Sequence, residues 1–462
     1  MTYIVTGGNG CKDTAIYNVF VGSNPAVALG SPGNTDICQG GTLTFPITNT
    51  AANPPGTTYT VTFGDGTPPV TFSQPPPASV THTFNVASCS AINGGLTSGS
   101  GAFPNAFTAT ITVQNPCGST AASVVPIYVS SPPNASFSST STTVCVNSST
   151  TFTNTSIGYN ATSGICTNAD PVIWSITPAT GWTTSGNLGS TLGQSDPNLW
   201  MPGSNSLSVN FTTIGSYTVQ LINGSTHLCG YDTITQIICV VPPAQPSFSM
   251  TPPNGCAPST AVVSNTSLGS AGCSSLGYSW VISYSSGCVY YSSGSYTYSS
   301  GTNTAQNPTF SFSTPGTYNV TLNVSNACGT VSASQSTVVK DIPYITINSV
   351  VPGACGSNTV SPASYFGFNG CGGTISNYAW TFNGANPSSG VGANPGNITF
   401  TNAVSNSIAV TATNECGSRS ASVSVPVWPI PVVSAGPSMT ICSGNPATLQ
   451  GSAFNGTPSY NF

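Results

Sequence analysis

Charged side chains are nearly missing from this sequence. Among 462 residues there are 3 Lys and Arg and 8 Asp and Glu, so 2% of the chain is charged, against about 25% in an average soluble protein. Binding to nucleic acid requires Lys and Arg gathered on one surface. Three cations spread along the whole chain exclude that class of partner.

Long apolar runs and helical patterns are missing as well. No segment is long and apolar enough to cross a bilayer, so we expect no membrane insertion in this segment. The 50 Gly and 38 Pro favour turns over helices, and the chain is too long for one ordinary domain. No secretory leader is recognisable, and the sequence opens and closes on strand-like segments. We therefore expect an internal part of a longer secreted protein.

The residue types that catalysis requires are scarce. The two histidines are His82 and His227, and we expect both to be structural, one in a strand and one in a turn. The acidic residues are single and scattered, which argues against paired carboxylates for glycoside hydrolysis and against a Ser/His/Asp constellation. Asp65, within Gly-Asp-Gly, is expected to stabilise a tight turn rather than bind calcium. We therefore predict a protein that is not an enzyme and has no cofactor or metal.

Cysteine, in contrast, recurs with a fixed rhythm. The chain has 16 Cys without the CxxC pairs of metal sites, which favours disulfides and an oxidising compartment outside the cytoplasm. Five times a Cys in a short turn, as in NPCGST, is followed 26 to 28 residues later by another Cys, as in TVCVNSSTTF. Self-similar spacing of this kind indicates a tandem array. The five pairs are Cys11/Cys38, Cys117/Cys145, Cys229/Cys256, Cys328/Cys355 and Cys416/Cys442.

Each repeat is predicted to form about seven short strands. Segments such as GTYNVTLNVSN at 316–326 alternate apolar and polar residues, which is the period of a half-buried strand. Trp174, Trp280 and Trp380 align on an aromatic strand. Together these features predict an all-β chain of tandem immunoglobulin-like β-sandwich domains in an extended array. The predicted divisions are 1–24 (end of a truncated upstream repeat), 25–130, 131–243, 244–341 and 342–430 (four whole repeats), and 431–462 (start of a truncated downstream repeat).

The motifs of two repeats resemble a known family. FGDGT at 63–67 is followed by THTF at 81–84 and FTATITVQN at 107–115, and NPTFSFSTPGTYNVTLNVSNACGTV stands at 307–331. These segments resemble the polycystic-kidney-disease (PKD) repeat, whose fold is an immunoglobulin-like β-sandwich. The Cys-bearing form, and AGPSMTICSGNPATL at 435–449, look like the repeats of giant surface adhesins of gliding bacteria exported by type IX secretion. The resemblance implies a PKD-like adhesin array.

Sandwich geometry predicts which cysteines can meet. Up-and-down strands place the turn cysteine and the cysteine before the Trp strand at one end of a repeat. The cysteine before the second strand lies at the other end, about 17–20 Å away, whereas bridged Cα atoms lie within about 7 Å. The predicted bridges are Cys166–Cys229, Cys273–Cys328 and Cys371–Cys416 at one end, and Cys38–Cys89, Cys145–Cys239 and Cys256–Cys288 at the other.

A rival scheme remains open. The same geometry permits the second-strand cysteine of one repeat to bridge the turn cysteine of the next, as Cys38–Cys229 would. Under the first scheme Cys11, Cys117, Cys355 and Cys442 are left over. Cys117 then faces the preceding repeat and Cys355 the following one, where bridges between repeats would stiffen the array.

Two further kinds of surface site are predicted. Thr14 and Thr233 each follow an Asp and precede an apolar residue, which resembles the O-glycan acceptor of the same bacterial group. Aromatic residues in the long loops suit sugar rings or a partner surface, although they can equally cover their own or the next sandwich. The predicted ligand-contact residues are Trp182, Trp200, Tyr290, Tyr291 and Tyr296.

These features predict a non-catalytic, extracellular repeat segment of a large cell-surface adhesin, gliding-associated in its specific form. It would present loops on a disulfide-stapled stalk and attach to surface glycans, other surfaces or neighbouring copies of itself. Two alternatives remain open. One is a structural subunit or stalk of an extracellular filament or sheath, and the other is a carbohydrate-binding accessory array of a secreted enzyme.

Overall fold

The computed structural model describes residues 1–18, 21–89, 103–162, 166–168, 171–227, 229–288, 290–401, 405–456 and 459. The chain divides into two compact units, Met1–Pro242 with Ala271–Ser274, and Pro243–Ser270 with Ser275–Phe462. Each unit contains two β-sandwiches with separate hydrophobic cores. Within the described residues, no helix has the length and apolarity needed to cross a membrane.

Sandwich 1 packs the sheet β4-β10-β9-β6-β7 against the sheet β3-β5-β8. Alternation along β5 shows why these residues form a strand: Leu43, Phe45 and Ile47 are buried, and the residues between them, Thr44 and Pro46, are exposed. The strands are β3 (Ala28–Leu29), β4 (Asp36–Cys38), β5 (Thr42–Thr48), β6 (Thr58–Thr62), β7 (Val70–Ser73), β8 (Ser79–Thr83), β9 (Phe107–Asn115) and β10 (Gly118–Ser130).

Sandwich 2 packs the sheet β12-β20-β19-β16 against β11-β13-β18-β17, with the small ribbon β14-β15 beside them. A short 3-10 helix, η1 (Pro197–Leu199), lies in its long loop. The strands are β11 (Phe137–Ser139), β12 (Thr143–Cys145), β13 (Ser148–Asn154), β14 (Asn160–Ala161), β15 (Cys166–Thr167), β16 (Val172–Thr177), β17 (Trp182–Ser185), β18 (Ser206–Phe211), β19 (Gly215–Gly224) and β20 (Tyr231–Val241).

Sandwich 3 repeats this plan, with β22-β28-β27-β24 against β21-β23-β26-β25. Along β27 apolar residues point inward at every second position, as the sequence pattern predicts. The strands are β21 (Phe248–Thr251), β22 (Asn254–Cys256), β23 (Ser259–Asn265), β24 (Gly277–Ser286), β25 (Tyr296–Ser300), β26 (Thr309–Phe312), β27 (Gly316–Asn326) and β28 (Gly329–Lys340).

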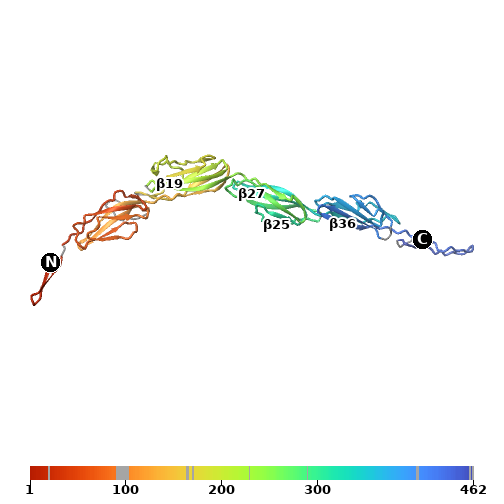
Figure 1. Ribbon diagram of the computed structural model, residues 1–462, viewed down its shortest axis with the longest axis horizontal. Helices are drawn as coiled ribbons and strands as arrows, with labels where there is room; N and C mark the ends of the chain where they lie inside the picture. The colour runs from red at the N-terminus through yellow and green to blue at the C-terminus, as the bar shows by residue number, and fades with distance from the viewer. Residues whose placement is uncertain are drawn as a thin grey trace. The chain divides into compact units, whose positions relative to one another are not determined.

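Sandwich 4 is built from the sheets β33-β32-β35-β36, β30-β34 and β29-β31 around one core. It carries the 3-10 helix η2 (Pro362–Ser364). The strands are β29 (Tyr344–Ile347), β30 (Asn358–Val360), β31 (Phe366–Asn369), β32 (Asn377–Asn383), β33 (Ser389–Val391), β34 (Ile398–Phe400), β35 (Ser407–Asn414) and β36 (Gly417–Ser424). Figure 1 shows each sandwich as a separate group of strands.

Two terminal ribbons contribute to none of the four cores. The first pairs β1 (Thr2–Thr6) with β2 (Lys12–Ile16), and the second pairs β37 (Val432–Ser434) with β38 (Ser452–Phe454). All residues of β1 and β2 are exposed. A two-stranded ribbon without a packed face is marginally stable by itself.

The buried tryptophans have equivalent surroundings in three sandwiches. Trp174, Trp280 and Trp380 are buried, and each indole N–H donates to a backbone carbonyl oxygen 2.8 Å away. Val61 fills the core in the corresponding strand β6 of sandwich 1. The sequence alignment of these positions therefore matches the structure, and the fold is an all-β series of immunoglobulin-like sandwiches.

Candidate functional site: the disulfide-bonded joints

One cysteine position ends a short edge strand in each of the first three sandwiches. Cys38, Cys145 and Cys256 are the last residues of β4, β12 and β22. Each edge strand runs parallel to the end of its sandwich's last strand and leaves the Cys opposite Ser130, Val241 or Lys340. We call Cys38, Cys145, Cys256 and Cys355 the edge cysteines.

A second cysteine position lies in the hairpin turn before the last strand. We call Cys11, Cys117, Cys229, Cys328 and Cys416 the turn cysteines. In four of these turns an Asn side chain two residues earlier accepts a hydrogen bond from the cysteine N–H, as Asn115 does at 2.9 Å and Asn414 at 2.9 Å. This Asx turn explains the recurring Asn-x-Cys motif.

Two disulfides cross the joint between sandwiches 1 and 2. Edge Cys38 is bonded to turn Cys229, with 5.3 Å between the Cα atoms. Cys89, which follows β8, is bonded to Cys166 on β15, with 5.6 Å between the Cα atoms. Both bridges connect sandwich 1 to sandwich 2 where the two sandwiches meet. Both Cα distances lie in the usual disulfide range.

Packing and hydrogen bonds close the same joint. Ala106 and Tyr128 of sandwich 1 form a small buried cluster with Ala161 of sandwich 2. The Ser131 N–H donates to the carbonyl oxygen of Tyr159 at 2.9 Å, and the Tyr159 N–H donates back to Ser131 Oγ at 2.8 Å. Because the connecting segment is short, the last strand of sandwich 1 ends directly on a loop of sandwich 2.

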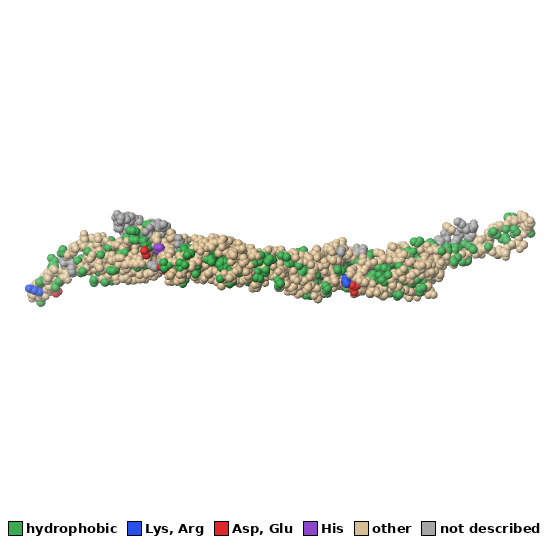
Figure 2. Space-filling model, turned by 90° about the horizontal axis from the view of Figure 1, so that it is seen from above, with side chains coloured by type: hydrophobic (Ala, Val, Ile, Leu, Met, Phe, Trp, Pro, Cys, Tyr) green, Lys and Arg blue, Asp and Glu red, His purple; other side chains and the backbone are tan. Residues whose placement is uncertain are grey.

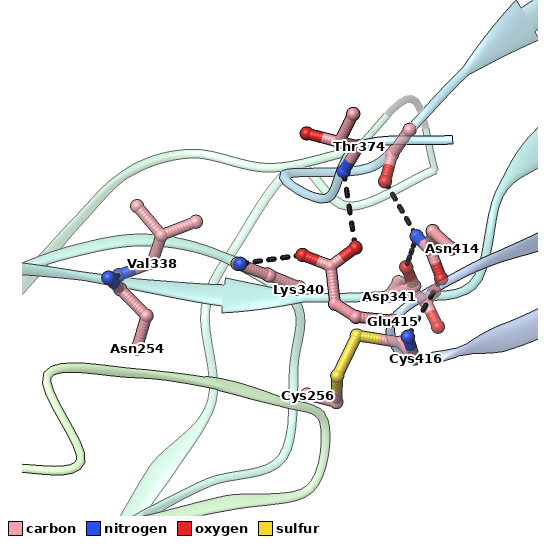
Figure 3. A network of polar contacts seen from close by, with 10 residues as sticks. Asn254, Cys256, Val338, Lys340, Asp341, Thr374, Asn414, Glu415 and Cys416 are labelled. Carbon is pink, nitrogen blue, oxygen red and sulfur yellow. Dashed lines mark hydrogen bonds and ion pairs between the residues drawn. A yellow bond between two sulfur atoms is a disulfide. The ribbon is translucent and has the colours of Figure 1, made fainter. Parts of the chain in front are cut away.

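The joint between sandwiches 3 and 4 repeats this arrangement. Edge Cys256 is bonded to turn Cys416, with 5.5 Å between the Cα atoms (Figure 3). Cys288, which follows β24, is bonded to Cys371, with 4.9 Å between the Cα atoms. A bridge also joins Cys239 on β20 to Cys273, and Cys145 and Cys328 are disulfide-bonded too.

An ion pair and a turn amide accompany the Cys256–Cys416 bridge (Figure 3). Lys340 Nζ donates to Glu415 Oε1 at 2.6 Å, and Glu415 Oε2 accepts from the Thr374 N–H at 3.2 Å. The hydrogen bond from Lys340 is the main cause of the lowered pKa of Glu415. Asn414 Nδ2 donates to the carbonyl oxygens of Asp341, at 2.7 Å, and Gly370, at 3.0 Å. Lys340 and Glu415 therefore form an ion pair where sandwiches 3 and 4 meet.

Two of the predicted ligand-contact tyrosines also belong to this joint. The ring of Tyr290 packs edge-on against Tyr344 of β29, with 4.6 Å between the ring centroids. The Tyr291 hydroxyl donates to Asp341 Oδ2 at 3.4 Å. Burial, and then the neighbouring Asp341 carboxylate, raise the pKa of Tyr291. Both rings therefore contact the segment that begins sandwich 4, although Tyr290 remains 66% exposed.

The predicted disulfide pairings within repeats are wrong. Cys166, Cys273 and Cys371 do lie at the same end of a sandwich as a turn cysteine, but each is bonded to a cysteine of the preceding sandwich. The prediction does not take into account that the ends of neighbouring sandwiches lie in contact, which places cysteines of two different sandwiches close together. The rival scheme, an edge cysteine bonded to the turn cysteine of the next sandwich, is the one observed for Cys38–Cys229 and Cys256–Cys416. The observed bridges contradict all six predicted pairings, which are Cys166–Cys229, Cys273–Cys328, Cys371–Cys416, Cys38–Cys89, Cys145–Cys239 and Cys256–Cys288.

The remaining predicted contact residues lie within sandwiches 2 and 3. Trp200 is 7% exposed, donates its indole N–H to the Gln194 carbonyl at 2.9 Å, and packs beside Tyr231. Trp182 packs against the core of sandwich 2. Tyr296 lies on β25 beside Tyr298. Trp200 lines a pocket of about 280 Å³ together with Pro197, Asn198 and Thr226.

The predicted O-glycosylation residues lie at exposed positions on strands, and His82 lies in a contact with Asp65. Thr14 and Thr233 are exposed on β2 and β20. His82 Nε2 lies 2.7 Å from Asp65 Oδ2, and its ring stacks on Phe63 at 3.8 Å. Asp65 also accepts hydrogen bonds from Thr67, so it stabilises the predicted turn. Among the described residues, no group of three or more His, Cys, Asp and Glu is placed to hold a metal ion.

Lys340, Glu415 and Asn414 were not anticipated as joint residues. A signal was present in the sequence, because Glu415 directly precedes turn Cys416 and Lys340 is one of three cations in the chain. The contact of Ala161 with Tyr128 has no comparable signal, since a single Ala in the two-residue strand β14 has no distinctive sequence pattern.

Comparisons with known proteins give structural neighbours only. No protein-family model matches the sequence, and no curated protein matches it. The fragment I67–I69 of the titin I-band is 14% identical and covers 64% of this chain and 98% of its own length, with a TM-score of 0.35. Sidekick-1 immunoglobulin domains 1–5 are 12% identical and cover 89% and 80%, with a TM-score of 0.27. Invasin, a bacterial integrin-binding protein, is 13% identical and covers 90% and 81%, with a TM-score of 0.26.

Proposed function

We propose that this chain is a non-catalytic adhesion array outside the cell that withstands mechanical force. The observation that carries the proposal is that disulfides cross the joints instead of closing within the sandwiches. Cys38–Cys229 encloses 191 residues and Cys256–Cys416 encloses 160. A force applied along the chain would pass through these bridges, so the enclosed residues would not be drawn out.

The remaining features support the same function. Disulfides persist in oxidising compartments outside the cytoplasm. A surface with few charges opposes close contact with another surface only weakly, and Figure 2 shows such a surface. The resemblance to repeats of gliding bacteria makes a PKD-like, gliding-associated adhesin exported by type IX secretion the specific form of this proposal. O-glycans on Thr14 and Thr233 belong to the same specific form.

Glycans are the proposed partners of the loops. The pocket beside Trp200 combines apolar rings with Asn198 and Thr226, and such a mixture suits a sugar. Tyr290 and Tyr296 offer further partly exposed rings.

Attachment under flow tests the proposed function. Polystyrene beads coated with the purified protein would be passed over glass, cellulose and mucin surfaces at increasing shear. We expect beads with oxidised protein to hold at shear that detaches beads with reduced and alkylated protein. The proposal would be contradicted if oxidised protein held no better than a serum albumin coating on all three surfaces.

A further inference from the structure

Cys355 occupies the edge-cysteine position of sandwich 4. It forms a parallel bridge with Trp428, as Cys38 does with Ser130 and Cys256 with Lys340. In each case the residue after the Cys donates its N–H to the carbonyl oxygen opposite. The distances are 2.8 Å for Gly356 to Trp428, 2.8 Å for Gln39 to Ser130, 2.9 Å for Val146 to Val241 and 2.8 Å for Ala257 to Lys340. The other three edge cysteines are disulfide-bonded, whereas Cys355 is an exposed thiol.

Cys117 occupies the turn-cysteine position of sandwich 1, with matching surroundings. Its Sγ lies 3.4 Å from the Gly22 carbonyl oxygen, and Sγ of bonded Cys229 lies 3.6 Å from that of Ser130. Asn115 Nδ2 donates to the next carbonyl, that of Ser23, at 3.2 Å. In the joint between sandwiches 3 and 4, Asn414 makes the same contact to Asp341, the residue after Lys340. The thiol of Cys117 is therefore already placed as in a closed joint, and it too is exposed.

The end of sandwich 4 presents an uncovered apolar surface beside Cys355. Trp428 is 41% exposed, whereas the equivalent Ser130, covered by sandwich 2, is 2% exposed. A pocket of about 530 Å³ opens here. It is lined mainly by Val350, Val425, Pro426, Val427, Trp428 and Pro429.

We propose that Cys117 and Cys355 are the open halves of two further joints of the same construction. Cys355 is bonded to the turn cysteine of an immunoglobulin-like sandwich that docks on the Trp428 surface and carries an Asn-x-Cys turn. Cys117 is bonded to the edge cysteine of a sandwich that precedes sandwich 1. In each reaction two thiols lose two protons and two electrons to a disulfide oxidant, which is reduced to a dithiol.

Disulfide mapping of the native secreted protein tests this inference. Thiols would be blocked with N-ethylmaleimide during denaturation, followed by digestion with pepsin under non-reducing conditions and mass spectrometry. We expect Cys355 in a cross-link with an Asn-x-Cys peptide, and Cys117 in a cross-link with a peptide in which the Cys ends an edge strand. In a Cys355→Ser variant the partner turn cysteine should react with N-ethylmaleimide, whereas in Val391→Ser, at an exposed position on β33, it should stay bonded.

The outcomes separate this inference from the proposed function, on whose extracellular location it rests. If Cys117 or Cys355 carries N-ethylmaleimide or a small thiol, or is bonded to a cysteine of its own class, while the joint bridges are intact, this inference alone is overturned. If the joint cysteines are reduced as well, both fail.

Discussion

At the scale of single residues, the Asp65–His82 contact is the clearest case of ionisation coupled to folding. The Asp65 side chain is 1% exposed. Burial alone would raise its pKa, but hydrogen bonds from Thr67 and His82 outweigh burial and lower it. A carboxyl group whose folded-state pKa is lowered stabilises the fold above its unfolded pKa, and this stabilisation is lost as the pH falls through the folded value.

We therefore expect Asp65→Asn to destabilise sandwich 1 by about 2 kcal/mol at pH 7, since a hydrogen bond to a buried charge is lost. The difference from the unmodified protein should shrink as the pH falls below the usual range of Asp. Hydrogen exchange of the β6 and β8 amides would measure it. Asp36→Asn, at an exposed position, is the control. A difference that persisted undiminished at acid pH would show that Asp65 acts without its charge.

At the scale of elements, a tyrosine holds the connection between β26 and β27. The hydroxyl of Tyr318 donates to the Thr314 carbonyl at 2.7 Å, and that of Tyr217 makes the same bond to Thr213 in sandwich 2 at 3.0 Å. This is the tyrosine corner of immunoglobulin-like sandwiches.

Tyr318→Phe should cost sandwich 3 about 1 kcal/mol or more, because the hydrogen bonds of the hydroxyl to Thr314 and Ser295 are lost with little change in volume. Urea unfolding followed by Trp280 fluorescence would show it as a lower midpoint. Tyr296→Phe, on the exposed part of β25, should leave the midpoint unchanged. Equal effects of the two substitutions would argue against the corner.

The paired bridges of one joint should be redundant for orientation. With Cys256 and Cys416 both changed to Ser, Cys288–Cys371 still ties sandwich 3 to sandwich 4. We expect spin labels on the two sandwiches to keep a narrow distance distribution, which broadens only when both bridges are removed. If the distance distribution without the Cys256–Cys416 bridge were already as broad as the distribution without both bridges, the Cys288–Cys371 bridge would have no role in orientation.

Strand positions could be predicted from the sequence, but bridge partners could not. Alternation locates β27, and the buried Trp280 marks β24, because burial on one face of a sheet imposes a period of two residues. Cysteine positions fix the end of a sandwich at which a sulfur lies. They do not tell whether the sulfur opposite belongs to the same sandwich or the next. Which sulfur is the partner depends on contacts between sandwiches, such as that of Ala161 with Tyr128. These contacts do not produce a repeating pattern in the sequence.

At the scale of the whole molecule, the bridges form covalent loops that bypass most of each compact unit. A chain pulled from both ends follows the shortest covalent path. That path enters at Cys38, crosses to Cys229, continues to Cys256 and crosses to Cys416. The sequence between the bridged cysteines carries no load as long as the sulfur–sulfur bonds hold.

The most direct test of this account is the extension of single molecules held by their two ends. The 191-residue loop hides about 60 nm of chain and the 160-residue loop about 50 nm, at roughly 3.3 Å per extended residue. We predict that oxidised protein will not release these lengths at forces that unfold the sandwiches, and that a reducing agent will release them. If oxidised and reduced molecules extended equally, the disulfides across the joints would not carry the applied force, and the account would be contradicted.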